Sequence, residues 1–266
     1  MLHKRHSKIS EMHRIIARLD IKNGVVIKGI HLEGQRRIGD PVDLARKYYE
    51  QGVDEILLMD SVASLYGRSN LFHLVEEACR SVFVPITMGG GIRTLDDVER
   101  ALASGADKVA VNTALVQHPD FVEKIADIYG SQCLVGSIEA FRKTDRWEVF
   151  VNNGREPTGK DVIEWARELE MRGVGELLVT SVDQEGTKSG FDVELYRQLE
   201  ASVQVPVIAC GGAGKLQHLV DLESKVETQG VAIASMLHYS IASLEDIKAC
   251  LPRTTRRRKI VNAGDR

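Results

Sequence analysis

The sequence predicts one α/β domain built as a (β/α)8 barrel, and three observations indicate this fold. The chain has 266 residues, 43% of them hydrophobic, and barrels of this class commonly contain about 250 residues. Short apolar runs rich in β-branched residues alternate with longer amphipathic stretches, which is typical of strands and helices around a parallel sheet. The second half of the chain also repeats motifs of the first half.

Eight apolar runs are predicted to form the barrel strands, at residues 14–19, 55–59, 84–88, 108–111, 133–138, 176–180, 205–209 and 230–233. The stretches between them predict helices, among them residues 41–51, 95–104, 119–129 and 159–172. In the last of these, Val162, Trp165, Ala166 and Leu169 fall on one helical face. Strand and helix therefore alternate along the whole chain.

Three motifs recur at a nearly constant offset. Residues 55–58 align with 176–179, and residues 84–91 align with 205–212, both at an offset of 121. Residues 108–113 match residues 230–235 at an offset of 122. We therefore expect a two-fold internal half-barrel repeat, whose eight units close a barrel without free sheet edges.

Both ends of the chain are expected to lie outside the barrel. Residues 1–11 form a polar extension without periodicity, residues 12–252 form the barrel, and residues 253–266 form a basic tail. A formal net charge of -3 gives the whole molecule no attraction for nucleic acid or an anionic membrane. No run approaches the ~18 apolar residues of a membrane span, so we expect a cytoplasmic protein.

Four cysteines lie far apart and form no CxxC pair, which indicates neither a zinc site nor a disulfide framework. Cys79, Cys133 and Cys210 are expected to be buried as small apolar residues. We expect no metal and no cofactor.

Two glycine-rich sets predict phosphate sites at the mouth of the barrel. The first combines residues 89–91 with Asn112 and Thr113, and the second combines residues 211–212 with Ala234 and Ser235. Glycine lets backbone N–H groups approach phosphate oxygens, and the hydroxyl groups add donors. Glycines that merely end strands are the alternative, but two symmetry-related sets favour a substrate with two phosphate groups.

Acidic residues follow four of the predicted strands, namely Asp20, Asp60, Glu139, and Asp183 with Glu185. Reacting groups of such barrels lie at these strand ends. Asp20 and Glu139 are repeat equivalents, so they are expected to face each other and to act as acid and base on one substrate. The structural alternative is that they cap loops or pair with Lys22 and Lys28.

Four charged residues stand at strand starts, on the opposite face of the barrel, namely Arg14, Glu55, Lys108 and Glu176. Charges on that face usually contribute to stability. Two cations and two anions from alternating strands are also able to form a salt-bridged ring across the barrel, which would serve as a gate.

The chain resembles the HisF family, the cyclase subunits of imidazole glycerol phosphate synthase, from residue 14 to about residue 251. The matching stretches are residues 14–24, 39–41, 87–92, 105–109, 112–113, 130–132, 180–183, 186–190 and 211–215. The resemblance implies a barrel that receives ammonia from a glutaminase subunit docked at its N-terminal face. It implies a bisphosphorylated ribulosyl aminoimidazole carboxamide substrate, converted to imidazole glycerol phosphate and an aminoimidazole carboxamide ribotide.

The resemblance also assigns roles to individual residues. Asp20 matches the first catalytic aspartate of the family, and Lys28 matches a lysine on its mobile first loop. The ammonia gate corresponds to Arg14, Glu55, Lys108 and Glu176. One phosphate site corresponds to Gly91, Asn112 and Thr113, and the other to Gly186, Gly212, Ala234 and Ser235. Asp183 and Glu185 fall on a loop expected to contact substrate.

Three residues depart from the pattern of the family. Glu139 replaces its second catalytic aspartate, Glu185 replaces an aspartate, and Arg18 replaces a small residue. Arg18 alternates with Asp20, so an ion pair inside the barrel is expected. Together with residues 31–34, 61–66 and 154–156, these departures resemble the WbuZ-type branch, which is associated with amidation of sugars in bacterial surface polysaccharides.

Several functions stay open on the sequence. An ammonia-using cyclase competes with a diverged paralogue that supplies ammonia for sugar amidation. A barrel without chemistry of its own, acting as an ammonia conduit, belongs to a different class. The isomerase that precedes HisF in histidine synthesis shares the repeat and the phosphate sites, but residues 14–20 and the charged ring favour HisF.

Overall fold

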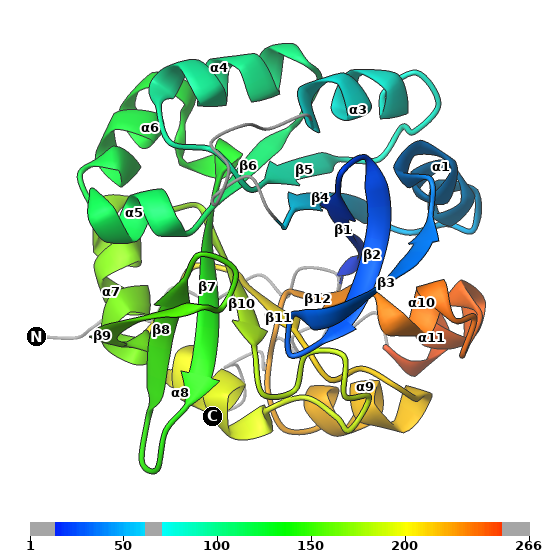
Figure 1. Cartoon of the computed structure of the whole chain (residues 1–266). Helices are drawn as coiled ribbons and strands as arrows, with labels where there is room; N and C mark the ends of the chain where they lie inside the picture. Colours follow the sequence, from blue (N-terminus) through cyan, green and yellow to red (C-terminus); the bar gives the residue numbers. More distant parts are fainter. Residues whose placement is uncertain (1–13, 62–70, 252–266) are drawn as a thin grey trace, which may run out of the picture.

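The computed structural model describes residues 14–61 and 71–251, and these residues form a closed barrel of eight parallel strands (Figure 1). The barrel strands are β1 (Arg14–Lys22), β4 (Glu55–Asp60), β5 (Ile86–Gly89), β6 (Lys108–Val111), β7 (Leu134–Arg142), β10 (Glu176–Ser181), β11 (Val207–Cys210) and β12 (Gly230–Ile233). Pairing of β7 with β10 and of β12 with β1 closes the ring. The predicted (β/α)8 barrel and its eight strands are confirmed.

The predicted extension, residues 1–11, and the predicted basic tail, residues 253–266, lie outside the described residues. The half-barrel repeat stays a prediction.

Two antiparallel hairpins extend the barrel at its mouth (Figure 1). β1 continues into β2 (Val25–Ile30) and β3 (Glu33–Gly39), and β7 continues into β8 (Trp147–Val151) and β9 (Glu156–Asp161). Asn23 and Gly24 turn the chain between β1 and β2 with φ values of 51° and 75°, as tight hairpin turns require. Each hairpin follows a strand that carries one of the predicted catalytic carboxylates.

Helices cover the outside of the barrel (Figure 1). The α-helices are α1 (Pro41–Glu50), α3 (Leu71–Ala78), α4 (Leu95–Ala103), α5 (Thr113–Gln117), α6 (Phe121–Tyr129), α7 (Val162–Arg172), α8 (Val193–Ser202), α9 (Leu216–Glu223), α10 (Ser235–His238) and α11 (Leu244–Cys250), with a 3-10 turn, η1 (Ser131–Cys133). Side-chain caps start several of them. The Asp40 carboxylate accepts from the first turn of α1, and Thr94 with Asp97 forms a capping box on α4.

The predicted helix over residues 159–172 is wrong at its start. Residues 159–161 belong to β9, and α7 begins at Val162. Asp161 caps the helix, because its carboxylate accepts hydrogen bonds from the N–H groups of Ile163 and Glu164. Among the described residues, no helix combines the length and hydrophobicity that crossing a membrane requires.

The apolar core has two parts, one between the helices and the outside of the barrel and a smaller one inside it. Trp165 on α7 is 2% exposed, and Trp147 on β8 is 3% exposed and donates from Nε1 to Asp192 at 2.8 Å. Cys133 and Cys210 are buried as expected, whereas Cys79 is only half-buried.

Candidate active site

The N-terminal end of the barrel carries a closed ring of four charged side chains. Arg14 on β1 donates to Glu55 Oε2 on β4 at 2.9 Å and also pairs with Glu176 on β10. Lys108 Nζ on β6 lies 3.0 Å from Glu55 Oε2 and 3.1 Å from Glu176 Oε2. Each cation therefore contacts both carboxylates, and the structure brings together the four residues that were predicted to form the ring.

The two acidic side chains of the ring are more deeply buried than the two basic ones. Glu55 and Glu176 are 2% and 6% exposed, whereas the side chains of Arg14 and Lys108 are 26% and 18% exposed. The cations therefore face the outside of the barrel at this end. The next layer inside the barrel is largely apolar and includes Ile16, Leu57, Ala110, Val135, Leu178, Ile208 and Ala232.

Arg18 and Asp20 lie above the apolar layer, on the same face of β1 as Arg14. Arg18 Nε donates to Asp20 Oδ1 at 2.9 Å, and both residues are buried. Burial by itself would raise the pKa of Asp20, but Arg18 and Lys28 outweigh this effect and hold the pKa below its ordinary value. Asp20 is therefore an ionised carboxylate at neutral pH, and the expected ion pair with Arg18 is present.

Lys28 on β2 reaches into the barrel mouth and joins a second carboxylate. Its ammonium group pairs with Glu185 and lies 4.0 Å from Asp20 Oδ2. Lys28 and Glu185 are both buried. Positive and negative side chains thus alternate in one row across the mouth, in the order Arg18, Asp20, Lys28 and Glu185.

Glu139 on β7 lies on the opposite side of the mouth from Asp20. β7 and β1 stand four strands apart in the closed ring of eight. Glu139 Oε2 accepts a 2.7 Å hydrogen bond from the Gly154 N–H in the β8–β9 hairpin. Burial raises the pKa of Glu139 to about 7, although the Gly154 N–H and Arg18 oppose the rise. Glu139 is therefore able to hold or release a proton near neutral pH.

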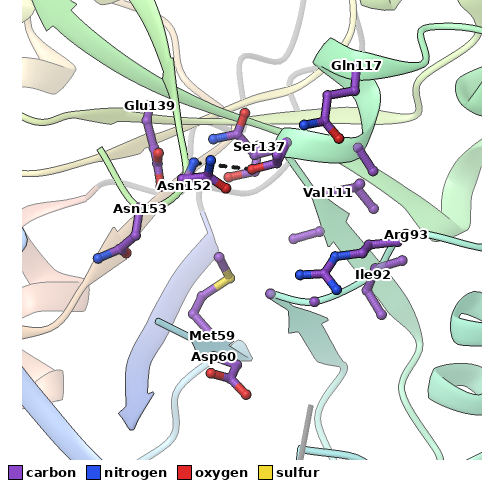
Figure 2. A pocket seen from close by; sticks show the side chains of 16 residues that line it. Met59, Asp60, Ile92, Arg93, Val111, Gln117, Ser137, Glu139, Asn152 and Asn153 are labelled. Carbon is purple, nitrogen blue, oxygen red and sulfur yellow. Dashed lines mark hydrogen bonds between the residues drawn. The ribbon is translucent and has the colours of Figure 1, made fainter. Parts of the chain in front are cut away.

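A cavity of about 320 Å³ lies beside Glu139 (Figure 2), which is within the usual range for small-molecule sites. Figure 2 shows Glu139, Asn152 and Asn153 on one side of this cavity and Arg93 on the other. The remaining lining residues are Met59, Asp60, Gly90, Gly91, Ile92, Ala110, Val111, Asn112, Thr113, Ala114, Gln117 and Ser137. The cavity thus contains Gly90, Gly91, Asn112 and Thr113 of the first predicted phosphate set, whereas Gly89 does not line it.

The polar groups of this cavity are held by the hairpin across from them. Asn112 Nδ2 donates to the Phe150 carbonyl at 3.1 Å, and Thr113 Oγ1 accepts from the Asn152 N–H at 3.2 Å. Asn112 Oδ1 is buried and has no hydrogen-bond partner. A buried acceptor without a partner costs free energy, so a ligand or water that donates to Asn112 Oδ1 would be stabilising here.

Two much smaller cavities, about 10 Å³ each, continue across the mouth. The first is lined by Asp20 and shares Asn153 with the large cavity. Lys28 and Glu185 line both small cavities. The second is lined by the residues predicted for the other phosphate site, namely Gly186, Gly212, Ala234 and Ser235. The structure therefore groups each predicted phosphate set around its own cavity.

Glycine is required at two positions of this second site. A side-chain carbon on Gly186 would collide with the Gly29 carbonyl oxygen of the β2–β3 hairpin, and one on Gly212 would collide with the Gly190 carbonyl oxygen. Both residues also have positive φ, 74° and 100°. The Gly186 contact thus lets the β2–β3 hairpin pack directly on this site, and the Gly212 contact brings together the loops that follow β10 and β11.

Two comparisons with known proteins agree with this geometry. The model of a family described as "Histidine biosynthesis protein" matches residues 14–243. The chain is 57% identical to "Imidazole glycerol phosphate synthase subunit HisF" of Legionella pneumophila over 205 residues, which cover 77% of this chain and 97% of that relative. The chain belongs to the HisF family. These matches give no support to the WbuZ-type branch that Arg18, Glu139 and Glu185 suggested.

One predicted site residue of this HisF-family chain points elsewhere. Asp183 Oδ2 accepts a 2.7 Å hydrogen bond from the Arg142 N–H at the end of β7. Asp183 lines none of the three cavities described above. The hydrogen bond from Arg142 joins the loop after β10 to the β7–β8 hairpin, which is a structural role. Contact of Asp183 with substrate stays a prediction.

Several lining residues of the large cavity were missed by the sequence analysis, namely Arg93, Gln117, Ser137, Asn152 and Asn153. Asn152 and Asn153 have positive φ values of 55° and 60°. The Asn-Asn-Gly sequence at 152–154 is a hairpin signal, so these two were open to prediction. No turn or motif in the sequence marks Arg93 and Gln117. They reach the cavity only through the folding of the HisF-family barrel.

Proposed function

We propose that the chain is the cyclase subunit of imidazole glycerol phosphate synthase. It uses ammonia from a glutaminase subunit to convert a bisphosphorylated ribulosyl aminoimidazole carboxamide substrate. The products are imidazole glycerol phosphate and an aminoimidazole carboxamide ribotide. The 57% identity to the Legionella pneumophila HisF subunit supports this assignment.

One observation carries the proposed chemistry. Asp20 and Glu139 stand on opposite strands of the mouth and differ in protonation, because two cations surround Asp20 while Glu139 has a pKa of about 7. Acid–base catalysis needs such a pair, one group to accept a proton and one to supply it. Asp20 is assigned as the proton acceptor, and Glu139 as the group that donates and recovers a proton.

The two glycine-bounded cavities provide binding sites at the ends of an elongated substrate. Gly91, Asn112 and Thr113 are assigned to one phosphate, and Gly186, Gly212, Ala234 and Ser235 to the other. Backbone N–H groups next to glycine suit phosphate oxygens. The reacting part of the substrate would then lie between them, beside both carboxylates.

Ammonia is proposed to enter at the opposite end, through the ring of Arg14, Glu55, Lys108 and Glu176. Three strongly exposed apolar side chains lie on that face, namely Phe83, Ile128 and Met171, which are 75%, 58% and 80% exposed. Phe83 precedes β5, and the other two lie in the last turns of α6 and α7. A contiguous exposed apolar patch marks a partner interface, and the proposal assigns these three side chains to the docking surface for a glutaminase subunit.

The test is turnover of the bisphosphorylated substrate with ammonium in place of the glutaminase. The parent chain should form imidazole glycerol phosphate, and Asp20→Asn should lower turnover by about 10²- to 10⁴-fold, the usual loss of an acid–base group. Asp221→Asn, on the outer helix α9, is the matched control and should be unchanged. Turnover of Asp20→Asn within tenfold of the parent would exclude its catalytic role, and a parent that binds glutaminase without turnover would favour the conduit.

A further inference from the structure

Arg18 occupies a defined layer of the barrel interior. Arg14, Ile16, Arg18 and Asp20 alternate along β1 and share its inner face. Arg14 belongs to the charged ring and Ile16 to the apolar layer, so Arg18 is the next inward residue toward the mouth. Its neighbours in this layer are Thr180 on β10 and Cys210 on β11, to which it is hydrogen-bonded. A molecule that moves from the ring to Asp20 must pass this layer.

The Arg18 side chain extends across the interior instead of along its own strand. Its Nη1 donates to Thr180 Oγ1 at 2.9 Å and to Cys210 Sγ at 3.2 Å. β12 and β11 both lie between β1 and β10 in the sheet order, so the side chain reaches past β12 to two further strands. Arg18 is 4% exposed. Its positive charge is therefore fixed inside the barrel, between the apolar layer and the mouth.

Asp20 would otherwise be a binding site for a small cation. A buried, ionised carboxylate strongly attracts positive charge, and ammonium that crossed the ring and the apolar layer would meet this carboxylate. Arg18 Nε already donates to Asp20 Oδ1, and Lys28 lies on the side of Oδ2. The inner approach to Asp20 is thus taken by a tethered cation.

We propose that Arg18 is a specificity-determining residue of the passage, which admits neutral ammonia to Asp20 and excludes ammonium and other small monovalent cations. This inference rests on the proposed function for its biological purpose. Neutral ammonia can exchange hydrogen bonds with the Thr180 hydroxyl and pass, whereas a cation meets the fixed guanidinium. The amine therefore reaches the substrate in its nucleophilic form and is not trapped as an ion pair with Asp20.

Rubidium, whose radius is close to that of ammonium, tests the exclusion without any turnover. Crystals of the parent, Arg18→Met and Arg18→Lys are soaked in rubidium chloride, and rubidium is located by its anomalous scattering. We expect a peak at Asp20 Oδ1 in Arg18→Met, and none in the parent or in Arg18→Lys, which keeps the charge. Rubidium at Asp20 in the parent, or its absence from folded Arg18→Met, overturns the inference. Arg18→Gln replaces Arg18→Met if the latter fails to fold.

Turnover with glutamine links the exclusion to function. Rubidium chloride, compared with an equal concentration of tetramethylammonium chloride, should lower glutamine-dependent turnover of Arg18→Met at least fivefold and leave the parent and the surface control Arg197→Met unchanged. Equal sensitivity of parent and Arg18→Met contradicts the inference. A parent without turnover contradicts the proposed function instead, and the rubidium positions then still decide whether Arg18 excludes cations.

Discussion

Asp20 and Glu139 illustrate how the surroundings of a residue decide its chemistry. Asp20 contacts Arg18 directly and has Lys28 4.0 Å away, so it is held ionised. Glu139 accepts from one backbone N–H, and burial raises its pKa to about 7. Two carboxylates at the ends of opposite barrel strands therefore have different protonation at neutral pH.

The raised pKa of Glu139 makes the stability of the fold depend on pH. The unfolded chain releases this proton near pH 4.5 and the folded chain near pH 7. Between these values the folded state binds the extra proton, so stability is lost as pH rises through this window. We expect the free energy of unfolding to fall by about 2 to 3 kcal/mol across this window. This is less than the pKa shift alone would give, because Glu139 is partly open to the cavity and solvent screens its charge.

Glu139→Gln should remove this loss, because glutamine cannot ionise and still offers an oxygen to the Gly154 N–H. Urea unfolding at pH 5 and pH 8 measures the effect. The parent should lose more stability than Glu139→Gln between the two pH values, and Glu194→Gln on the outer helix α8 should behave like the parent. An identical pH dependence for parent and Glu139→Gln would show that Glu139 does not titrate in this range.

At the residue scale, the sequence located the groups at strand ends but not their partners. Positions of Asp20, Glu139 and the four ring residues follow from strand ends and starts, which are local. The pairing of Lys28 with Glu185 joins residues 157 positions apart and depends on how the β2–β3 hairpin folds back. The partner of Asp183 was equally hard to predict, because its hydrogen bond to Arg142 forms only when β7 lies beside β10 in the folded barrel.

At the element scale, the β2–β3 hairpin covers the small cavity that is proposed as the second phosphate site. The His31 N–H donates to the Glu185 carbonyl at 2.8 Å, and His31 Nδ1 lies 3.0 Å from the Val182 carbonyl oxygen. Lys28 reaches Glu185 beneath these contacts. The cavity that remains is about 10 Å³, too small for a phosphate group, so we predict that the hairpin or the Lys28 side chain moves when a phosphate binds there.

Lys28→Met should destabilise the fold by about 3 to 5 kcal/mol, because it leaves Glu185 buried without its cation. The double substitution Lys28→Met with Glu185→Met should recover most of this loss, since neither charge then remains unpaired. Urea unfolding of the single and double variants gives the coupling energy. The exposed pair of Arg46 and Asp43 is the control, with little coupling expected. Additive effects at Lys28 and Glu185 would contradict a closed hairpin in solution.

Barrel strands were easier to predict than the two hairpins. Each barrel strand is a short apolar run, buried on both sides, and such runs are evident in the sequence. β2, β3, β8 and β9 lie at the mouth, and they are held by contacts with the rim, such as the hydrogen bond from Gly154 to Glu139. The wrong start of the 159–172 helix has the same origin, since residues 159–161 pair within the β8–β9 hairpin.

At the scale of the whole molecule, the ring and the mouth lie at opposite ends of one barrel, so the proposed ammonia entry is separate from the proposed catalytic site. Lys108→Met should therefore change glutamine-dependent turnover more than ammonium-dependent turnover. Glu55 and Glu176 lose one partner each but keep Arg14. Lys108→Arg keeps the charge and serves as the control. Equal effects of Lys108→Met on both activities would contradict a role in passage.

Docking of a glutaminase should depend on the exposed apolar side chains at the N-terminal face. Replacing Phe83 and Met171 with serine should weaken binding of the glutaminase subunit at least tenfold, which corresponds to about 1.4 kcal/mol. Ammonium-dependent turnover should stay unchanged, because the mouth is not altered. Val220→Ser, on α9 at the side of the barrel, is the matched control. Unchanged glutaminase affinity in titration calorimetry would place the docking surface elsewhere.

The positions of the two tryptophans give the barrel a built-in optical reporter. Trp147 and Trp165 are the only indoles in the chain, and both are buried in the second of the two predicted halves. Fluorescence emission therefore follows the loosening of β8 and α7, while far-ultraviolet circular dichroism follows every helix and strand. Coincident melting curves from the two signals would mean that both halves unfold as one cooperative unit. Separated curves would mean that one half can lose its structure while the other persists.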